Sequence, residues 1–153
     1  MALFDVDFPD DFMSELLGTD FAKIAEAALT DAAPLLERSM KKCCRDAIQH
    51  EGDSELVGSI ESGTPKQTKD KGAWIVNVGP RGYSSIKKYT AVDGKGKKTK
   101  RKYRVSNALK AIWLEYGIPG HQMARPFLQA SINETKTTVV SKIQSVYDRM
   151  VGK

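Results

Sequence analysis

The sequence predicts an α+β fold: a small antiparallel β-sheet packed against a long N-terminal helix and a long C-terminal helix, with an inserted basic β-hairpin or loop. Three observations predict this fold. Apolar residues recur at helical spacing between residues 20 and 50, and again between residues 126 and 150. Residues 73–79 alternate apolar and polar side chains, as a half-buried strand does. Glycine and proline punctuate the short stretch before the last helix, which is typical of a hinge.

The composition is that of one globular domain. A chain of 153 residues with 41% hydrophobic and 28% charged residues is long enough to bury a core. No apolar run approaches the ~18–20 residues of a membrane span, and the acidic N-terminus lacks the basic region of a signal peptide. Cys43 and Cys44 are adjacent and have no partner at metal-ligand spacing, so we expect two reduced thiols.

Residues 1–18 are predicted to be an acidic N-terminal arm, followed by a single domain over residues 19–153. Residues 1–20 contain six acidic side chains and no basic one, for a net charge of −6. A short helical turn is expected at residues 11–17. The arm either becomes ordered only on a partner or packs on its own subunit, and the sequence leaves both options open.

A long helix is expected from Thr19 or Asp20, either of which suits a helix N-cap, to about His50. Pro34 lies within this run, where it removes a hydrogen bond and crowds the preceding turn at a cost of roughly 3 kcal/mol. It should kink the helix or divide it into two. The expected inner face consists of Phe21, Ile24, Ala28, Ala32, Leu35, Ser39, Cys43 and Ala47, with Leu36 and Met40 beside it.

A strand pair with a long connection is expected next. Residues 54–59 could hold one more helical turn before the chain becomes extended at Ile60. The connection, residues 63–72, is polar and rich in turn-forming residues. Residues 73–79 form the clearest strand, with Trp74, Val76 and Val78 on one side. Trp74 is therefore expected to anchor the core or a subunit interface.

Residues 80–104 are strongly basic, with ten basic side chains against Asp93 and a net charge of +9. Asp93 and Gly94 stand between extended flanks that contain tyrosines, which is a hairpin signal. The basic side chains could neutralise DNA phosphates, contact an acidic protein surface such as the arm of a neighbouring subunit, or simply be solvated. The candidate contact residues are Lys95, Lys97, Lys98, Lys100, Arg101, Lys102 and Arg104.

The hinge on which the fold should close spans residues 108–128. A short amphipathic helix, with Leu109, Ile112 and Trp113 on one face, should end at Gly117, because glycine accepts a positive φ. After a turn, the closing helix should begin with Pro126 at or near its first position. Its apolar stripe is expected to consist of Leu128, Ile132, Thr135, Val139, Ile143, Val146 and Met150.

The hinge resembles one protein family. Its pattern is an aromatic-Leu-Glu-aromatic-Gly helix end, Trp113 to Gly117, then a short loop and Ala-Arg-Pro-Phe-Leu at residues 124–128. This order resembles the tail-completion (minor tail component) proteins of tailed bacteriophages, which sit where the tail meets the head. Residues 54–60 and 76–79 also resemble the first strand pair of that family. The resemblance covers roughly residues 20–80 and 105–150, so residues 80–104 are an insertion.

The resemblance implies a structural virion protein of the tail or neck, made in the cytoplasm of the bacterial host. It implies a homo-oligomeric ring of six copies that bridges the tail terminator or tail tube to the neck connector, with genomic DNA in the channel. Arg125 would satisfy carbonyls around the hinge turn or pair with Glu115, and Phe127 would anchor the closing helix. The residues expected to define fold and assembly are Trp74, Trp113, Glu115, Gly117, Arg125, Pro126 and Phe127. Two alternatives remain, a basic DNA-binding module and a tail terminator protein.

No pattern in the sequence predicts catalysis, a cofactor or a metal. His50 and His121 are the only histidines, and neither lies in a Ser/His/Asp or metal-ligand pattern. No glycine-rich phosphate-binding loop is present. Asp10 and Asp11 are a carboxylate pair, but they lie in the predicted arm, where no pocket would tune their pKa.

Overall fold

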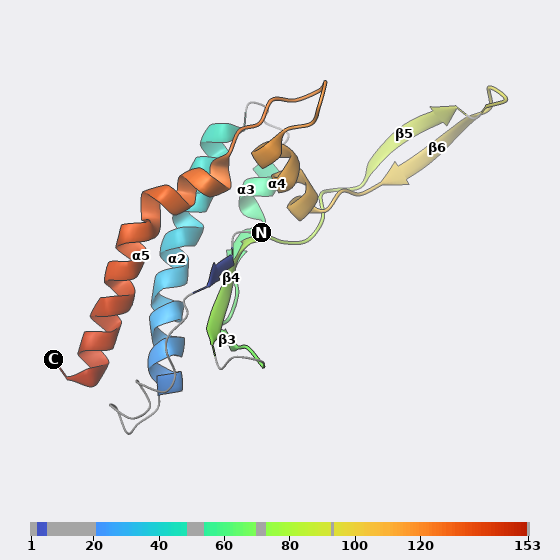
Figure 1. Cartoon of the computed structure of the whole chain (residues 1–153). Helices are drawn as coiled ribbons and strands as arrows, with labels where there is room; N and C mark the ends of the chain where they lie inside the picture. The colour runs from blue at the N-terminus through green and yellow to red at the C-terminus, as the bar shows by residue number, and fades with distance from the viewer. Residues whose placement is uncertain (1–2, 6–20, 49–53, 70–72, 93, 153) are drawn as a thin grey trace.

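The computed structural model describes residues 3–5, 21–48, 54–69, 73–92 and 94–152. The long helices α2 (Phe21–Ala47) and α5 (Phe127–Val151) lie side by side, and α2 also packs on a small antiparallel sheet (Figure 1). The predicted α+β fold with two long packed helices is confirmed. Among the described residues, no helix is both long and apolar enough to cross a membrane.

The strand β4 (Trp74–Pro80) is the centre of the main sheet. The strands β1 (Leu3–Asp5) and β2 (Ile60–Ser62) flank it, and the short β3 (Lys66–Gln67) also pairs with it, all antiparallel. Strand β1 was not predicted, and it places part of the N-terminal arm on the sheet of its own chain. The helical turn expected at residues 11–17 and the helix start at Thr19 or Asp20 lie outside the described residues.

Helix α2 is not divided at Pro34, contrary to one of the two predicted outcomes. Pro34 is exposed, while Ala33 before it and Leu36 after it are buried, so packing on both sides holds the helix together across the proline. The buried face is also broader than predicted, because α2 packs against both α5 and the sheet. It includes Ala25, Leu29, Ala33 and Cys44, which were not expected, whereas the expected Phe21, Leu35, Cys43 and Ala47 are only partly buried.

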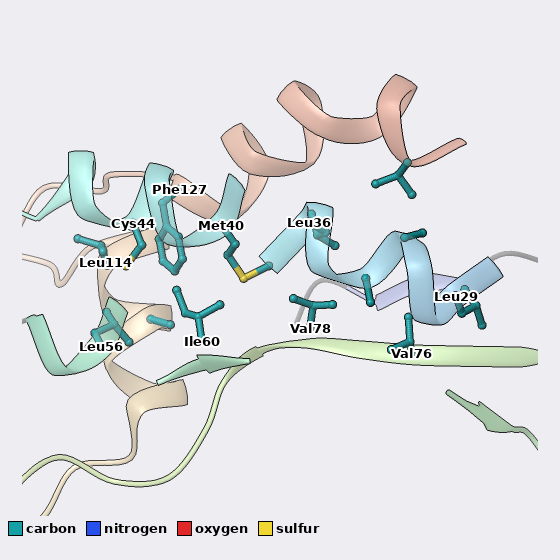
Figure 2. Close-up of a cluster of buried hydrophobic side chains, with 14 residues drawn as sticks. Leu29, Leu36, Met40, Cys44, Leu56, Ile60, Val76, Val78, Leu114 and Phe127 are labelled. Carbon is teal, nitrogen blue, oxygen red and sulfur yellow. The ribbon is translucent and has the colours of Figure 1, made fainter. Parts of the chain in front are cut away.

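The core lies where α2, α5, the sheet and the hinge meet (Figure 2). Phe127 and Met40 are its largest fully buried side chains, and the first is only 1% exposed. Trp74 packs half-buried against this core. Cys43 and Cys44 are free thiols, as expected. The stripe predicted for α5 faces the core except at its end, where Met150 is 44% exposed.

Two short helices flank the sheet strands and the ribbon in the chain. Helix α3 (Ser54–Gly58) confirms the expected helical turn, and the chain becomes extended only at Ile60. Helix α4 (Asn107–Tyr116) is the predicted hinge helix and ends at Gly117.

The predicted basic hairpin is confirmed. Strands β5 (Lys87–Val92) and β6 (Lys98–Tyr103) pair with each other as a separate two-stranded sheet. This ribbon projects from the body beyond α4 (Figure 1). We call it the basic ribbon.

Candidate functional site

Glu115 holds the start of α5 from the end of α4. Its carboxylate accepts hydrogen bonds from the backbone N–H groups of Leu128 (2.8 Å) and Gln129 (3.2 Å). Pro126, at the N-cap position, makes no side-chain capping bond. Glu115 is 7% exposed, so a buried carboxylate of one helix satisfies free donors of another and complements its dipole.

Gly117 allows the chain to double back against itself. It has φ 76° and ψ 179°, a conformation that is open essentially to glycine alone. A Cβ placed there would lie 2.7 Å from both the Ala124 nitrogen and the Gln122 oxygen. The turn after it is closed by two hydrogen bonds between the backbones of Ile118 and Gln122. Both the backbone angles and the lack of space for a Cβ therefore require a glycine at position 117.

Arg125 ties the hinge to the far end of α2. Its backbone N–H donates to the Leu114 carbonyl at 2.7 Å, and its guanidinium donates to the Ala47 carbonyl at 3.3 Å. The sequence suggested a carbonyl of the hinge turn or Glu115 as its partner, whereas Ala47 is the last residue of α2. A cation at this position also complements the negative end of the α2 dipole.

The apolar face expected for α4 points outward. The buried face of α4 is instead Asn107, Ala111, Leu114 and Glu115. We call Leu109, Ile112 and Tyr116 the α4 outer face; they are 40%, 46% and 76% exposed. Exposed apolar side chains also occur at both ends of this helix: Tyr83 is bridged through its backbone to the N-cap Ser106, and Met123 follows the helix.

Trp113, between the two faces of α4, is half-buried. It lines a cleft of about 360 Å³ at the base of the basic ribbon, together with Tyr103, Lys87 and Lys110. This open cleft lies between the base of the basic ribbon and the body.

The base of the basic ribbon is fixed to the body by hydrogen bonds. The backbone N–H of Ser84 donates to the Val105 carbonyl (2.8 Å), and that of Asn107 donates to the Gly82 carbonyl (3.0 Å). Glu55 of α3 accepts from the Ser85 N–H at 3.1 Å. Hydrogen bonds from Ser85, and then the positive charges of Lys110 and Lys87, lower the pKa of the Glu55 carboxyl group. The ribbon therefore leaves the body in a defined direction.

The register of the ribbon separates its side chains into two faces. One face, which we call the lysine face, carries the directly opposite pairs Lys88–Lys102, Thr90–Lys100 and Val92–Lys98. The opposite face carries Tyr89 and Tyr103, whose rings contact edge to face with centroids 5.4 Å apart. Lys87 and Arg101 share that second face.

The structure brings the predicted hinge residues together and sets the predicted basic residues apart on the ribbon. Lys95 and Lys97 lie near its tip, Arg104 lies just past its end, and Arg104 stacks over the Tyr83 ring at 5.2 Å. Lys88 was missed by the sequence analysis. A two-residue turn at Asp93 and Gly94 would have placed it opposite Thr99, whereas the observed register pairs Val92 with Lys98 and Lys88 with Lys102.

His121 is exposed in the hinge turn, while His50, Asp10 and Asp11 lie outside the described residues. Within the described part of the chain, no three His, Cys, Asp or Glu side chains are grouped so that they could hold a metal ion. Comparison with known proteins finds no matching family model, no similar curated protein and no similar solved structure.

Proposed function

We propose that this chain is a structural virion protein of a tailed bacteriophage, a tail-completion or head–tail joining component. It assembles as a homo-oligomeric ring, of six copies by the family resemblance, at the head-proximal end of the tail. There it bridges the tail terminator or tube to the neck connector. Its role is architectural rather than enzymatic, and it reaches the virion from the host cytoplasm.

The observation that carries the proposal is the α4 outer face. The buried face of α4 packs Ala111 and Leu114 into the core, yet Leu109, Ile112 and Tyr116 remain in water on its outer face. Grouped apolar side chains that are exposed on a surface mark interaction sites. A neighbouring copy of the chain would cover the outer face, and a head-to-tail contact whose rotation returns to the first copy closes into a ring.

The distribution of charge supports the same arrangement. Residues 1–20 have a net charge of −6 and residues 80–104 a net charge of +9. Opposite charges on different parts of one chain steer the head-to-tail encounter of adjacent copies at long range, which does not require the basic ribbon itself to lie in the contact.

The test compares two double variants that add the same charge to exposed apolar positions. Ile112→Lys with Tyr116→Lys changes the α4 outer face, and Val140→Lys with Met150→Lys changes exposed positions of α5 that are 53% and 44% exposed. In sedimentation and negative-stain images, the wild type and the α5 variant should form rings. The α4 variant should be monomeric and folded, with the melting temperature that the wild type shows once it is diluted to the monomer.

A wild-type chain that stays monomeric at every concentration, or that is missing from purified particles of the phage that encodes it, would contradict the proposal. A reconstruction of the particle neck separates it from the tail-terminator alternative, because the proposed protein contacts the neck connector whereas a terminator ends the tube without reaching it.

A further inference from the structure

We infer that the basic ribbon is a binding site for double-stranded DNA, and that the lysine face contacts the phosphates of the duplex without reading its sequence. The residues of this face that carry the charge are Lys88, Lys98, Lys100 and Lys102. The inference goes beyond the assembly role and does not depend on it, because it rests on the ribbon alone.

The four lysines form one surface because of the strand register. Residues two apart on a strand point the same way about 6.8 Å apart, so Lys98, Lys100 and Lys102 form a row. Lys88 lies directly opposite Lys102 and adds a fourth charge to that row's end. All four side chains are exposed.

This concentration of charge lacks a counterpart in the described part of the chain. There, the ion pairs involve Glu37, Glu134 and Asp31, all on the long helices, and none reaches the lysine face. Like charges directly opposite each other destabilise a strand pair, and an isolated two-stranded ribbon is marginal in water. An anionic ligand on this face removes the repulsion, so the ribbon is most stable when it is occupied.

The composition of the face favours a nucleic acid over a protein. Protein interfaces are enriched in aromatic residues and depleted in lysine, whereas here both tyrosines of the strands lie on the opposite face. Lysine contacts phosphate as a point charge, and proteins that follow a duplex backbone use this chemistry. A two-stranded ribbon also fits the major groove of B-DNA. Single strands are instead held by aromatic stacking, which the lysine face does not offer.

The anchored base makes the ribbon a directed arm. The hydrogen bonds between residues 82–85 and residues 105–107, together with the contact to Glu55, orient it away from the body.

The experiment measures binding of the full chain to a short labelled DNA duplex of arbitrary sequence as a function of salt. Four phosphate contacts give a slope of log affinity against log salt of about −3.6, so affinity should fall about 100-fold between about 50 and 200 mM salt. Changing Lys88, Lys98, Lys100 and Lys102 together to Gln should abolish this part of the slope. Changing Lys23, Lys66, Lys69 and Lys136 to Gln removes the same charge elsewhere and should leave the slope unchanged.

A second pair of variants tests the face itself. Lys98→Gln with Lys100→Gln should reduce the magnitude of the slope by about 1.8, while Lys87→Gln with Arg101→Gln, on the other face of the same strands, should not change it. Equal effects of the two pairs would overturn the assignment of the face.

The inference would also be overturned if the wild type failed to bind duplex at about 50 mM salt. A peptide of residues 1–20 that bound the lysine face when DNA did not would show a protein contact instead. Ring formation, measured on the same samples, reports separately on the proposed function.

Discussion

Glu115 shows at the scale of a single residue how the hinge is held. Its two bonds to the α5 N-terminus replace the capping bond that Pro126 does not supply. We expect Glu115→Ala to lower the free energy of unfolding by about 2 kcal/mol, because two backbone donors lose a charged acceptor. Glu115→Gln keeps one carbonyl acceptor and should cost less. Denaturant unfolding measures both; equal stability of Glu115→Ala and the wild type would show that the cap contributes nothing.

Comparing Gly117 with Gly120 separates the cost of a positive φ from the cost of a Cβ that collides with the backbone. Both have positive φ, 76° and 74°, but a Cβ at Gly120 would meet nothing within 4 Å. Gly120→Ala should therefore cost only the left-handed backbone penalty, about 1 kcal/mol. Gly117→Ala adds a collision with two backbone atoms and should cost at least about 3 kcal/mol. Thermal unfolding of the two variants checks this order, and a similar loss for both would refute the close approach.

At the scale of elements, the basic ribbon is structurally separate from the sheet of the body. We expect replacement of residues 88–102 by Asn-Gly to leave the melting temperature of the body unchanged, since β5 and β6 pair only with each other among the strands. Ser84→Ala, at the base, is the contrasting variant. It removes the hydroxyl that accepts from the Val105 N–H and should cost about 1 kcal/mol. A large drop in melting temperature on removal of the ribbon would mean that it supports the fold.

The elements differ in how far the sequence could predict them. Periodicity predicted α2, β4 and α5, because each has a long or strongly alternating pattern, and the Asp-Gly turn signal predicted the ribbon. Periodicity failed on the orientation of α4, because the covered face includes the polar Asn107 and Glu115 while the apolar Leu109 and Ile112 stay exposed. Strand β1 has three residues and is too short to show a pattern.

The hinge residues could be singled out from the sequence, but their partners could not. Glu115 reaches residues 128 and 129, and Arg125 reaches the carbonyl of Ala47, 78 positions away. Such contacts depend on how whole elements meet, which local propensity does not determine. The lysine face likewise needs the exact pairing of Lys88 with Lys102, which follows only when the turn is placed to the residue.

At the scale of the whole molecule, two carboxylates connect α2 to its neighbours on either side. Glu134 of α5 accepts from Lys42 (2.6 Å), Cys43 (3.4 Å) and Ser39 (3.1 Å) of α2, and these bonds lower its pKa. Glu37 of α2 accepts from the backbone and side chain of Ser62 in β2. Burial opposes ionisation of Glu37, but hydrogen bonds from Lys41 and Ser62 outweigh it and lower its pKa.

These shifts predict that acid weakens both contacts of α2. A carboxyl group whose folded pKa lies below its unfolded value of about 4.3 adds stability that is complete above that pH and is lost as pH falls through the folded pKa. The contribution of these two groups to the free energy of unfolding should therefore be constant from neutral pH to about 5. It should decline below about pH 4.3. Glu37→Gln with Glu134→Gln should be less stable than the wild type at neutral pH, with the difference shrinking as pH falls. Urea unfolding at a series of pH values measures this, with Glu26→Gln and Glu61→Gln, both exposed, as the control pair. If the difference in the free energy of unfolding between the wild type and the double variant did not shrink at low pH, the charge of the two carboxylates would not contribute to the contacts of α2.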